Sequence, residues 1–153
     1  MTLRIWTAQY SIRDRDRLDV TRGGCERARA QGKPVPGIVF APSSELLRSG
    51  QHDRAAAEGD EEREREAWER YAARYRREML VSYARHRATW EELRARDRAV
   101  LVCFCGRDPV ALGRCHRLLL AGFLVQLGAE YVGELAQADA ILPEPSAPKG
   151  AAA

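Results

Sequence analysis

An unbroken apolar run, residues 99 to 105, constrains the fold of this chain more than any other feature. The run reads Ala-Val-Leu-Val-Cys-Phe-Cys, a pattern typical of a parallel strand that is covered on both faces. A second apolar stretch, from about Arg114 to Leu127, predicts a helix that ends at Gly128, and Tyr131–Leu135 predicts a further strand. Strand, helix and strand in this order indicate a βαβ unit built on a parallel sheet.

Three earlier segments also have the character of strands. Leu3–Tyr10 is rich in strand formers and partly alternates, and Arg17–Arg22 forms a short extended segment that is closed by Gly23-Gly24. Gly37–Ala41 is a short apolar run that predicts a buried strand ending at Pro42. We therefore expect an α/β fold, a single three-layer-like domain with a mostly parallel central sheet.

Aromatic and apolar residues recur at steps of three or four between residues 61 and 98, which predicts one long amphipathic helix. The members of this stripe are Trp68, Tyr71, Tyr75, Met79, Tyr83, His86, Trp90 and Leu93. We expect the stripe to pack in the core, with His86 as a hydrogen-bonded core residue. Before this helix, Ser43 or Ser44 is predicted to cap a short helix, and Ser49–Asp60 is predicted to be a surface loop.

The composition fits one globular domain in 153 residues, with 45% apolar residues and a net charge of +3. Nucleic acid is not the favoured partner, because glutamates are interspersed among the arginines of the long helix. No stretch approaches the roughly 18 apolar residues of a membrane span, and the N-terminus lacks a signal-peptide pattern. We expect a cytoplasmic protein that binds no membrane, with a domain over residues 1–142 and a disordered Pro/Ala-rich tail over residues 143–153.

The turn after the central strand carries most of the reactive side chains. Ligands of parallel sheets bind beyond the carboxyl ends of the strands, where the free N–H groups of the next helix favour anions. That helix opens with Arg114-Cys115-His116-Arg117. We predict that Arg114 and Arg117, with Cys105 at the strand end, bind a small anionic ligand such as a nucleotide. Cys115, whose thiol would be acidified at a helix start, and His116 are the catalytic candidates.

Two residues from the beginning of the chain complete the predicted site. Asp19 is a third catalytic candidate, as an acid or base alternative to His116, and Arg22 is a further ligand-binding candidate. We expect Asp19, Arg22, Cys115, His116 and Arg117 to converge in one cleft.

Three cysteines and one histidine raise the question of a metal site. Neighbouring residues on a helix point about 100° apart, so Cys115 and His116 are not expected to share one ion. The Cys-x-x-Cys spacing of structural zinc sites is also missing around Cys103 and Cys105. We therefore predict no metal site and interpret Cys103 and Cys105 mainly as small buried hydrophobic residues. The sequence identifies no cofactor.

Two motifs occur in an order that is typical of a known family. One is Leu18-Asp19-Val20-Thr21-Arg22, and the other is the apolar strand followed by Cys115-His116-Arg117. They resemble the small bacterial and phage proteins grouped as domain of unknown function 488, whose early motif is Asp-Val-Arg-like and lacks the inserted Thr21. A subgroup is similar in four further segments, namely Phe40-Ala41-Pro42-Ser43, Met79-x-x-Ser82-Tyr83, Trp90-Glu91 and Gly128-Ala129-Glu130-Tyr131-x-Gly133-Glu134.

The resemblance spans about residues 3 to 135 and implies a compact α/β fold. It also implies a site that gathers Asp19 and Arg22 with the Cys-His-Arg triplet. The group often has an acidic residue at the end of the late strand, where this chain has Cys105. A catalytic carboxylate is therefore not expected at that position.

Three functions stay open on the sequence alone. The first is a protein that binds a nucleotide or another small anion, with or without catalysis. The second is a non-enzymatic binding or regulatory module that presents the aromatic stripe from Trp68 to Trp90 to a partner. The third is a thiol-redox or metal protein that uses Cys103, Cys105 and Cys115.

Overall fold

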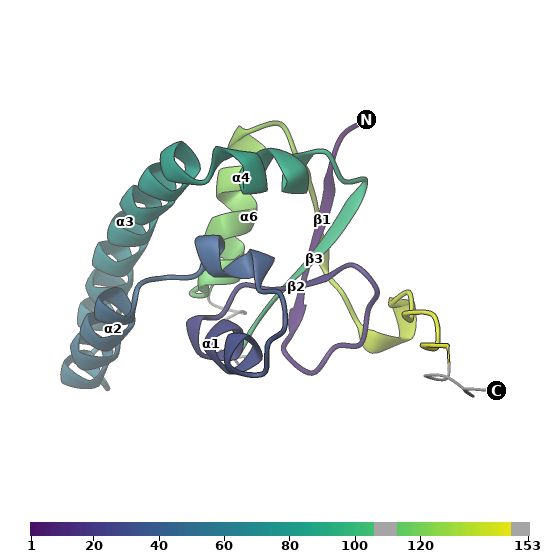
Figure 1. Cartoon of the computed structure of the whole chain (residues 1–153). Helices are drawn as coiled ribbons and strands as arrows, with labels where there is room; N and C mark the ends of the chain where they lie inside the picture. Colours follow the sequence, from purple (N-terminus) through teal and green to yellow (C-terminus); the bar gives the residue numbers. More distant parts are fainter. Residues whose placement is uncertain (106–112, 148–153) are drawn as a thin grey trace.

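The computed structural model describes residues 1–105 and 113–147 of the chain. Four strands form one sheet in the order β2-β3-β1-β4, and every pair of neighbours is parallel. Figure 1 shows β1 and β3 crossing the middle of the molecule. The strands are β1 (Arg4–Gln9), β2 (Arg17–Asp19), β3 (Arg98–Cys103) and β4 (Glu130–Glu134). The predicted α/β class with a parallel sheet is confirmed.

Five α-helices and two short 3₁₀ helices accompany the sheet within the described residues. The α-helices are α1 (Arg22–Ala30), α2 (Ser44–Ala57), α3 (Glu61–Arg85), α4 (Arg87–Arg94) and α6 (His116–Gln126), and the 3₁₀ helices are η1 (Pro36–Phe40) and η2 (Gln137–Asp139). Helices α2 and α3 pack against each other as a hairpin that extends away from the sheet (Figure 1). No helix in the described ranges is long and apolar enough to cross a membrane.

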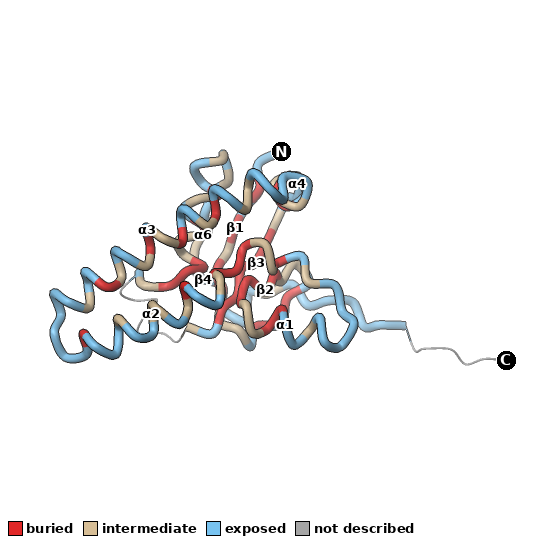
Figure 2. The backbone as a smooth tube through the Cα atoms, turned by 60° about the vertical axis from the view of Figure 1, so that its left-hand side comes forward, coloured by how far each residue is buried: buried red, intermediate tan, exposed pale blue. Residues whose placement is uncertain are grey.

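The two faces of the sheet bury separate clusters of apolar side chains. Along β3, Ala99 and Leu101 face one cluster, which also takes side chains from η1, α3, α4 and α6. Val100 and Val102 face the other cluster, which is smaller and includes Leu135 from the C-terminal segment. Figure 2 shows buried residues gathered along the strands, whereas the outer ends of α2 and α3 are mostly exposed. The central strand is therefore covered on both faces, as its apolar run predicts.

The predicted long helix is two helices that meet at His86. The backbone of His86 has φ −119° and ψ 37°, which interrupts the helix between α3 and α4. Its side chain is exposed, so the prediction of a core histidine is wrong. The stripe itself packs as expected at Tyr75, Met79, Trp90 and Leu93, which are buried.

The predicted strand Gly37–Ala41 is wrong, because these residues lie in and just after the 3₁₀ helix η1. Pro36 opens η1, and its proline ring favours a helical turn at that position. Two backbone carbonyls of η1 accept hydrogen bonds from side chains of α3. The Tyr75 hydroxyl donates to Phe40 O at 2.7 Å, and the Ser82 hydroxyl donates to Val39 O at 2.5 Å.

Two further boundaries differ from the prediction. The extended segment ends at Asp19, because Thr21 caps α1 by accepting a hydrogen bond from Gly24 N at 3.0 Å. The predicted loop Ser49–Asp60 is mostly the second half of α2, which Ser43 caps as expected. Packing against α3 keeps this polar sequence helical, a tertiary effect that local sequence does not reveal.

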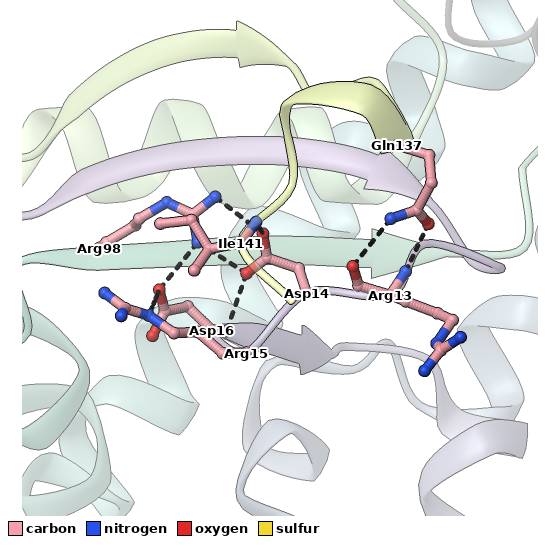
Figure 3. Close-up of polar contacts among 7 residues, drawn as sticks. All are labelled: Arg13, Asp14, Arg15, Asp16, Arg98, Gln137 and Ile141. Atoms are coloured by element: carbon pink, nitrogen blue, oxygen red, sulfur yellow. Dashed lines mark hydrogen bonds and ion pairs between the residues drawn. The ribbon is translucent and has the colours of Figure 1, made fainter. Parts of the chain in front are cut away.

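An ion-pair cluster joins the C-terminal segment to the start of β3 and to the loop before β2 (Figure 3). Arg98 donates to both carboxylate oxygens of Asp14, at 2.6 and 2.8 Å, and to Asp16 at 2.8 Å. The backbone N–H of Ile141 donates to Asp14 at 2.9 Å. Burial alone would raise the pKa of Asp14, but the hydrogen bonds from Arg98, Asp16 and Ile141 outweigh burial and lower it. The chain is thus anchored up to Ile141.

Parts of two predictions fall outside the described residues. Residues 143–147 of the predicted tail are exposed and lack regular structure, and residues 148–153 lie outside the described ranges. Residues 106–112, which make up most of the predicted turn between the central strand and the next helix, lie outside them as well.

Candidate functional site

A sulfur cluster lies where the carboxyl end of β3 meets the start of α6. Cys103 ends the strand, Cys105 follows it, Cys115 caps the helix and His116 opens it. One potential ligand atom from each of these four residues lies within 4.8 Å of all the others. Cys103 Sγ and Cys115 Sγ are 2.8 Å apart, well beyond the disulfide bond length of about 2.05 Å. All four cysteines of the chain, including Cys25, are free thiols.

The backbone of Cys115 explains how neighbouring residues reach the same cluster. Cys115 has φ −141° and ψ 139°, an extended conformation, and the helix begins only at His116. The 100° separation of neighbours on a helix therefore does not apply to Cys115 and His116. Contrary to the expectation from the sequence, Cys115 and His116 direct ligand atoms to the same cluster, and the prediction of no metal loses its geometric basis.

The backbone carbonyl of Val20, the residue after β2, holds His116 in one tautomer. Its Nε2 lies 3.0 Å from Val20 O, and a carbonyl oxygen only accepts, so Nε2 carries the hydrogen. The side chain is buried, and burial lowers the pKa of His116, which keeps the ring neutral. A neutral ring with hydrogen on Nε2 has its lone pair on Nδ1.

Arg117 occupies a different place from the one predicted for a ligand-binding residue. Its side chain is fully buried, and its Nη2 donates to Glu134 Oε1 on β4 at 2.6 Å. Its Nη1 donates to Cys103 Sγ at 3.1 Å and to Cys105 O at 3.4 Å. Arg117 therefore joins α6 to β4 and to the sulfur cluster and does not face an open cavity.

The thiols of the sulfur cluster differ strongly in acidity. Hydrogen bonds from the Cys105 and Cys115 thiols, together with the nearby Arg117, lower the pKa of Cys103 far below its usual range despite burial. The same contact with Cys103 raises the pKa of Cys105 to about 11 and also raises the pKa of Cys115. Cys103 is therefore the most acidic thiol of the cluster.

An aromatic cavity of about 650 Å³ opens beside the sulfur cluster, between the α2–α3 hairpin and the start of α6. Trp68 and Tyr71 of α3 form one wall as a stacked pair, with ring centroids 5.4 Å apart. Cys105, Cys115 and His116 also line the cavity. The other lining residues, two of which are arginines, are Leu47, Gly50, Gln51, Arg54, Glu64, Ala67, Phe104 and Arg114.

The structure does not gather the five predicted residues in one cleft. Asp19 lines a separate cavity of about 390 Å³ between β2, α1 and η1. Its carboxylate accepts from the Tyr10 hydroxyl at 3.1 Å and from Thr21 N and Oγ1 at 2.9 and 2.6 Å. Arg22 donates to Pro42 O at 2.7 Å. Only Cys115 and His116 of the five line the aromatic cavity, and the predicted ligand-binding residues Arg114 and Cys105 line it as well.

Comparison with known families identifies the chain. Residues 3–128 match the family model DUF488-N3a, described as the active DUF488-N3 subclade. The chain belongs to the DUF488 family. This membership confirms the resemblance drawn from the Asp19 and Cys-His-Arg motifs, both of which lie within the matched residues. No curated protein and no solved structure gives a significant match.

Sequence reasoning on this DUF488 chain missed several residues of the site. Cys103 was predicted to be structural, although it is the centre of the sulfur cluster. Trp68 and Tyr71 were assigned to core packing, although they are only half-buried and line the aromatic cavity. Glu134 carries no local signal, because only the fold brings it to Arg117. The Cys103-x-Cys105 spacing was the one available signal, since residues two apart on a strand share a face.

Proposed function

We propose that this DUF488 protein binds a small anionic molecule with a flat ring, such as a nucleotide, in the aromatic cavity, and that this molecule is its substrate. One observation carries the proposal, namely that stacked rings and arginines line the same cavity at the start of α6. Aromatic faces stack on nucleobases with about 1–3 kcal/mol per base, and arginine pairs with phosphate through two parallel hydrogen bonds. The matched subclade is described as active, which supports catalysis.

We assign binding of the anion to Arg114 and Arg54, which line the aromatic cavity, and not to Arg117. Arg117 already has Glu134 and the sulfur cluster as partners. Arg114 Nη1 lies 3.8 Å from Glu64 Oε2, a long contact between partly exposed side chains. A pair of this kind contributes little stability, so a phosphate can replace Glu64 at low cost. The N–H groups at the start of α6 add a favourable field for the anion.

The alternative of a partner surface on the aromatic stripe has less support. Tyr75, Met79 and Trp90 are buried within the domain and cannot contact a partner. Trp68 and Tyr71 face the aromatic cavity, which favours a small molecule over a protein surface.

Calorimetric titration with a panel of nucleoside mono-, di- and triphosphates and inorganic phosphate tests the proposal. At least one nucleotide is expected to bind the wild type, and Arg114→Ala is expected to raise its Kd about 10- to 100-fold, the range of a charge-assisted hydrogen bond. Arg87→Ala is the matched control, because Arg87 is exposed, pairs with its helical neighbour Glu91 and does not line the aromatic cavity. Failure of every ligand to bind, or an equal effect of both variants, would contradict the proposal.

A further inference from the structure

We propose that Cys103, Cys105, Cys115 and His116 bind one zinc ion. Three sulfurs and one imidazole nitrogen form a ligand set that zinc prefers, with tetrahedral coordination. Cys103 and Cys105 lie at the end of β3, and Cys115 and His116 lie at the start of α6. This proposal goes beyond the binding of a substrate in the aromatic cavity and does not depend on it.

The spacing of the ligand atoms suits a tetrahedral ion. With bonds of about 2.3 Å to sulfur, the corners of a tetrahedron lie about 3.8 Å apart. The four ligand atoms lie within 4.8 Å of one another, and Cys103 Sγ is 2.8 Å from Cys115 Sγ. Binding would widen the shortest separation and narrow the longest by about 1 Å each, a shift that side-chain rotation supplies.

The imidazole of His116 is already oriented for metal binding. A histidine that binds a metal through one nitrogen usually donates from the other to a carboxylate or a backbone carbonyl, and this second contact fixes the ring. Nε2 of His116 makes such a contact with Val20 O at 3.0 Å. We therefore assign Nδ1 as the zinc ligand.

Arg117 offsets the charge that the zinc site would carry. Three thiolates and a divalent ion leave one net negative charge in the interior, and a buried charge needs a partner. The guanidinium of Arg117 is fully buried and donates to Cys103 Sγ at 3.1 Å and to Cys105 O at 3.4 Å. Such hydrogen bonds to a ligand sulfur are typical of the surroundings of metal sites.

The proposed zinc ion has a structural role. Four protein ligands complete a tetrahedral shell, so the ion joins the end of the central strand to the start of α6. On binding, the three thiols lose their protons to solvent as the zinc–sulfur bonds form. Cys105, the least buried of the three, places the zinc site next to the aromatic cavity.

Metal content of the full chain, purified without chelators, is the first test. Mass spectrometry of the metal is expected to find about one zinc per chain in the wild type. Cys25→Ser is the matched control, because Cys25 is also buried but donates to Asp19 O, away from the cluster. This variant should keep the zinc. Cys115→Ser should bind zinc more than about 100-fold more weakly in chelator competition, since even residues outside the ligand shell contribute 10- to 100-fold.

Cobalt substitution of the reduced wild type keeps the proposal testable if a cysteine variant fails to fold. Tetrahedral cobalt with three thiolates should give intense visible bands and sulfur-to-cobalt charge-transfer bands, and zinc should displace them. If folded, reduced protein contains no zinc and shows none of these bands after cobalt is added, the proposal is overturned. A stable Cys103–Cys115 disulfide in protein purified without metal would overturn it as well, in favour of a redox function.

A separate outcome distinguishes this proposal from the proposed function. Nucleotide binding that Arg114→Ala weakens, in a protein without zinc, would retain the aromatic cavity and reject the metal site. Zinc at full occupancy, without binding of any nucleotide, would retain the metal site and reject the proposed nucleotide site in the aromatic cavity.

Discussion

At the scale of single residues, Arg117 shows how context decides what a charged side chain does. In the sequence it stands beside a cysteine and a histidine at a helix start, where arginine suits anion binding. In the structure it is fully buried and paired with Glu134, which also accepts from Thr7 Oγ1 at 2.5 Å. The arginine–carboxylate pair thus joins α6 to β4.

Replacement of Arg117 should destabilise the fold strongly. Arg117→Met fills similar space but leaves Glu134 without its partner, and we expect a loss of about 2 kcal/mol, below the usual cost of breaking a fully buried pair because Glu134 is partly exposed. Urea unfolding measures this change in the free energy of unfolding. Arg87→Met, which removes an exposed ion pair with Glu91 and a contact of the guanidinium with the Tyr83 ring, should change stability little. Equal losses in the two variants would refute the structural role.

Asp14 should give the fold a specific sensitivity to acid. Its pKa is lowered in the folded state, so its contribution to stability is present above the unfolded value of about 3.8 and is lost as the pH falls through the folded value. Asp14→Asn removes the charge that Arg98 contacts. This substitution should lower the free energy of unfolding by about 2 kcal/mol at pH 7. The difference in the free energy of unfolding between wild type and variant should shrink below pH 3.8.

Urea unfolding at several pH values between 7 and 3 measures that difference. The control Asp53→Asn changes a partly exposed carboxylate that lies 3.8 Å from Arg70, so it should show no comparable cost. A difference between wild type and Asp14→Asn that stays constant over the whole range would contradict the assignment.

At the scale of elements, two glycines of the first third of the chain have opposite structural constraints. A Cβ on Gly37, in η1, would lie 1.7 Å from the backbone oxygen of Asp19. A Cβ on Gly23, in α1, would meet nothing within 4 Å. The close approach at Gly37 is what allows η1 to pack directly on the end of β2.

Alanine at these positions should therefore act in opposite directions. Gly37→Ala forces η1 away from β2 and should lower stability by about 3 kcal/mol, as overpacking against backbone does. Gly23→Ala should raise stability by about 0.5 kcal/mol through its higher helix propensity. Thermal unfolding of both variants checks the signs. A neutral Gly37→Ala would show that η1 does not touch β2 as described.

Elements were predictable from the sequence where their pattern is long or extreme. The strand β3 and the helix α3 follow from an unbroken apolar run and from sustained helical spacing. The five residues of η1 are too few to distinguish a buried strand from a helical turn. The polar sequence of α2 shows no stripe, because the helix packs mainly on α3 and remains largely exposed.

At the scale of the whole molecule, the sequence located the candidate site but not its composition. The rule that ligands bind beyond the carboxyl ends of parallel strands pointed to the start of α6, where the sulfur cluster and the aromatic cavity lie. The rule could not show that Asp19 faces a separate cavity, nor that α3 contributes Trp68 and Tyr71. Such contacts depend on how distant segments pack, and no local pattern encodes them. The extended backbone of Cys115 was missed because helix starts are uncertain by one or two residues.

The strand order has a consequence for synthesis of the chain. The first strand, β1, lies between β3 and β4, so Arg4 pairs with Arg98 on one side and with Glu130 on the other. A ribosome must therefore release the chain through β4, at Glu130–Glu134, before β1 has both neighbours. Until then its apolar side chains and free backbone groups need protection from aggregation. Such non-local pairing is also typical of slow folding, so the sheet is completed only after β4 has left the ribosome.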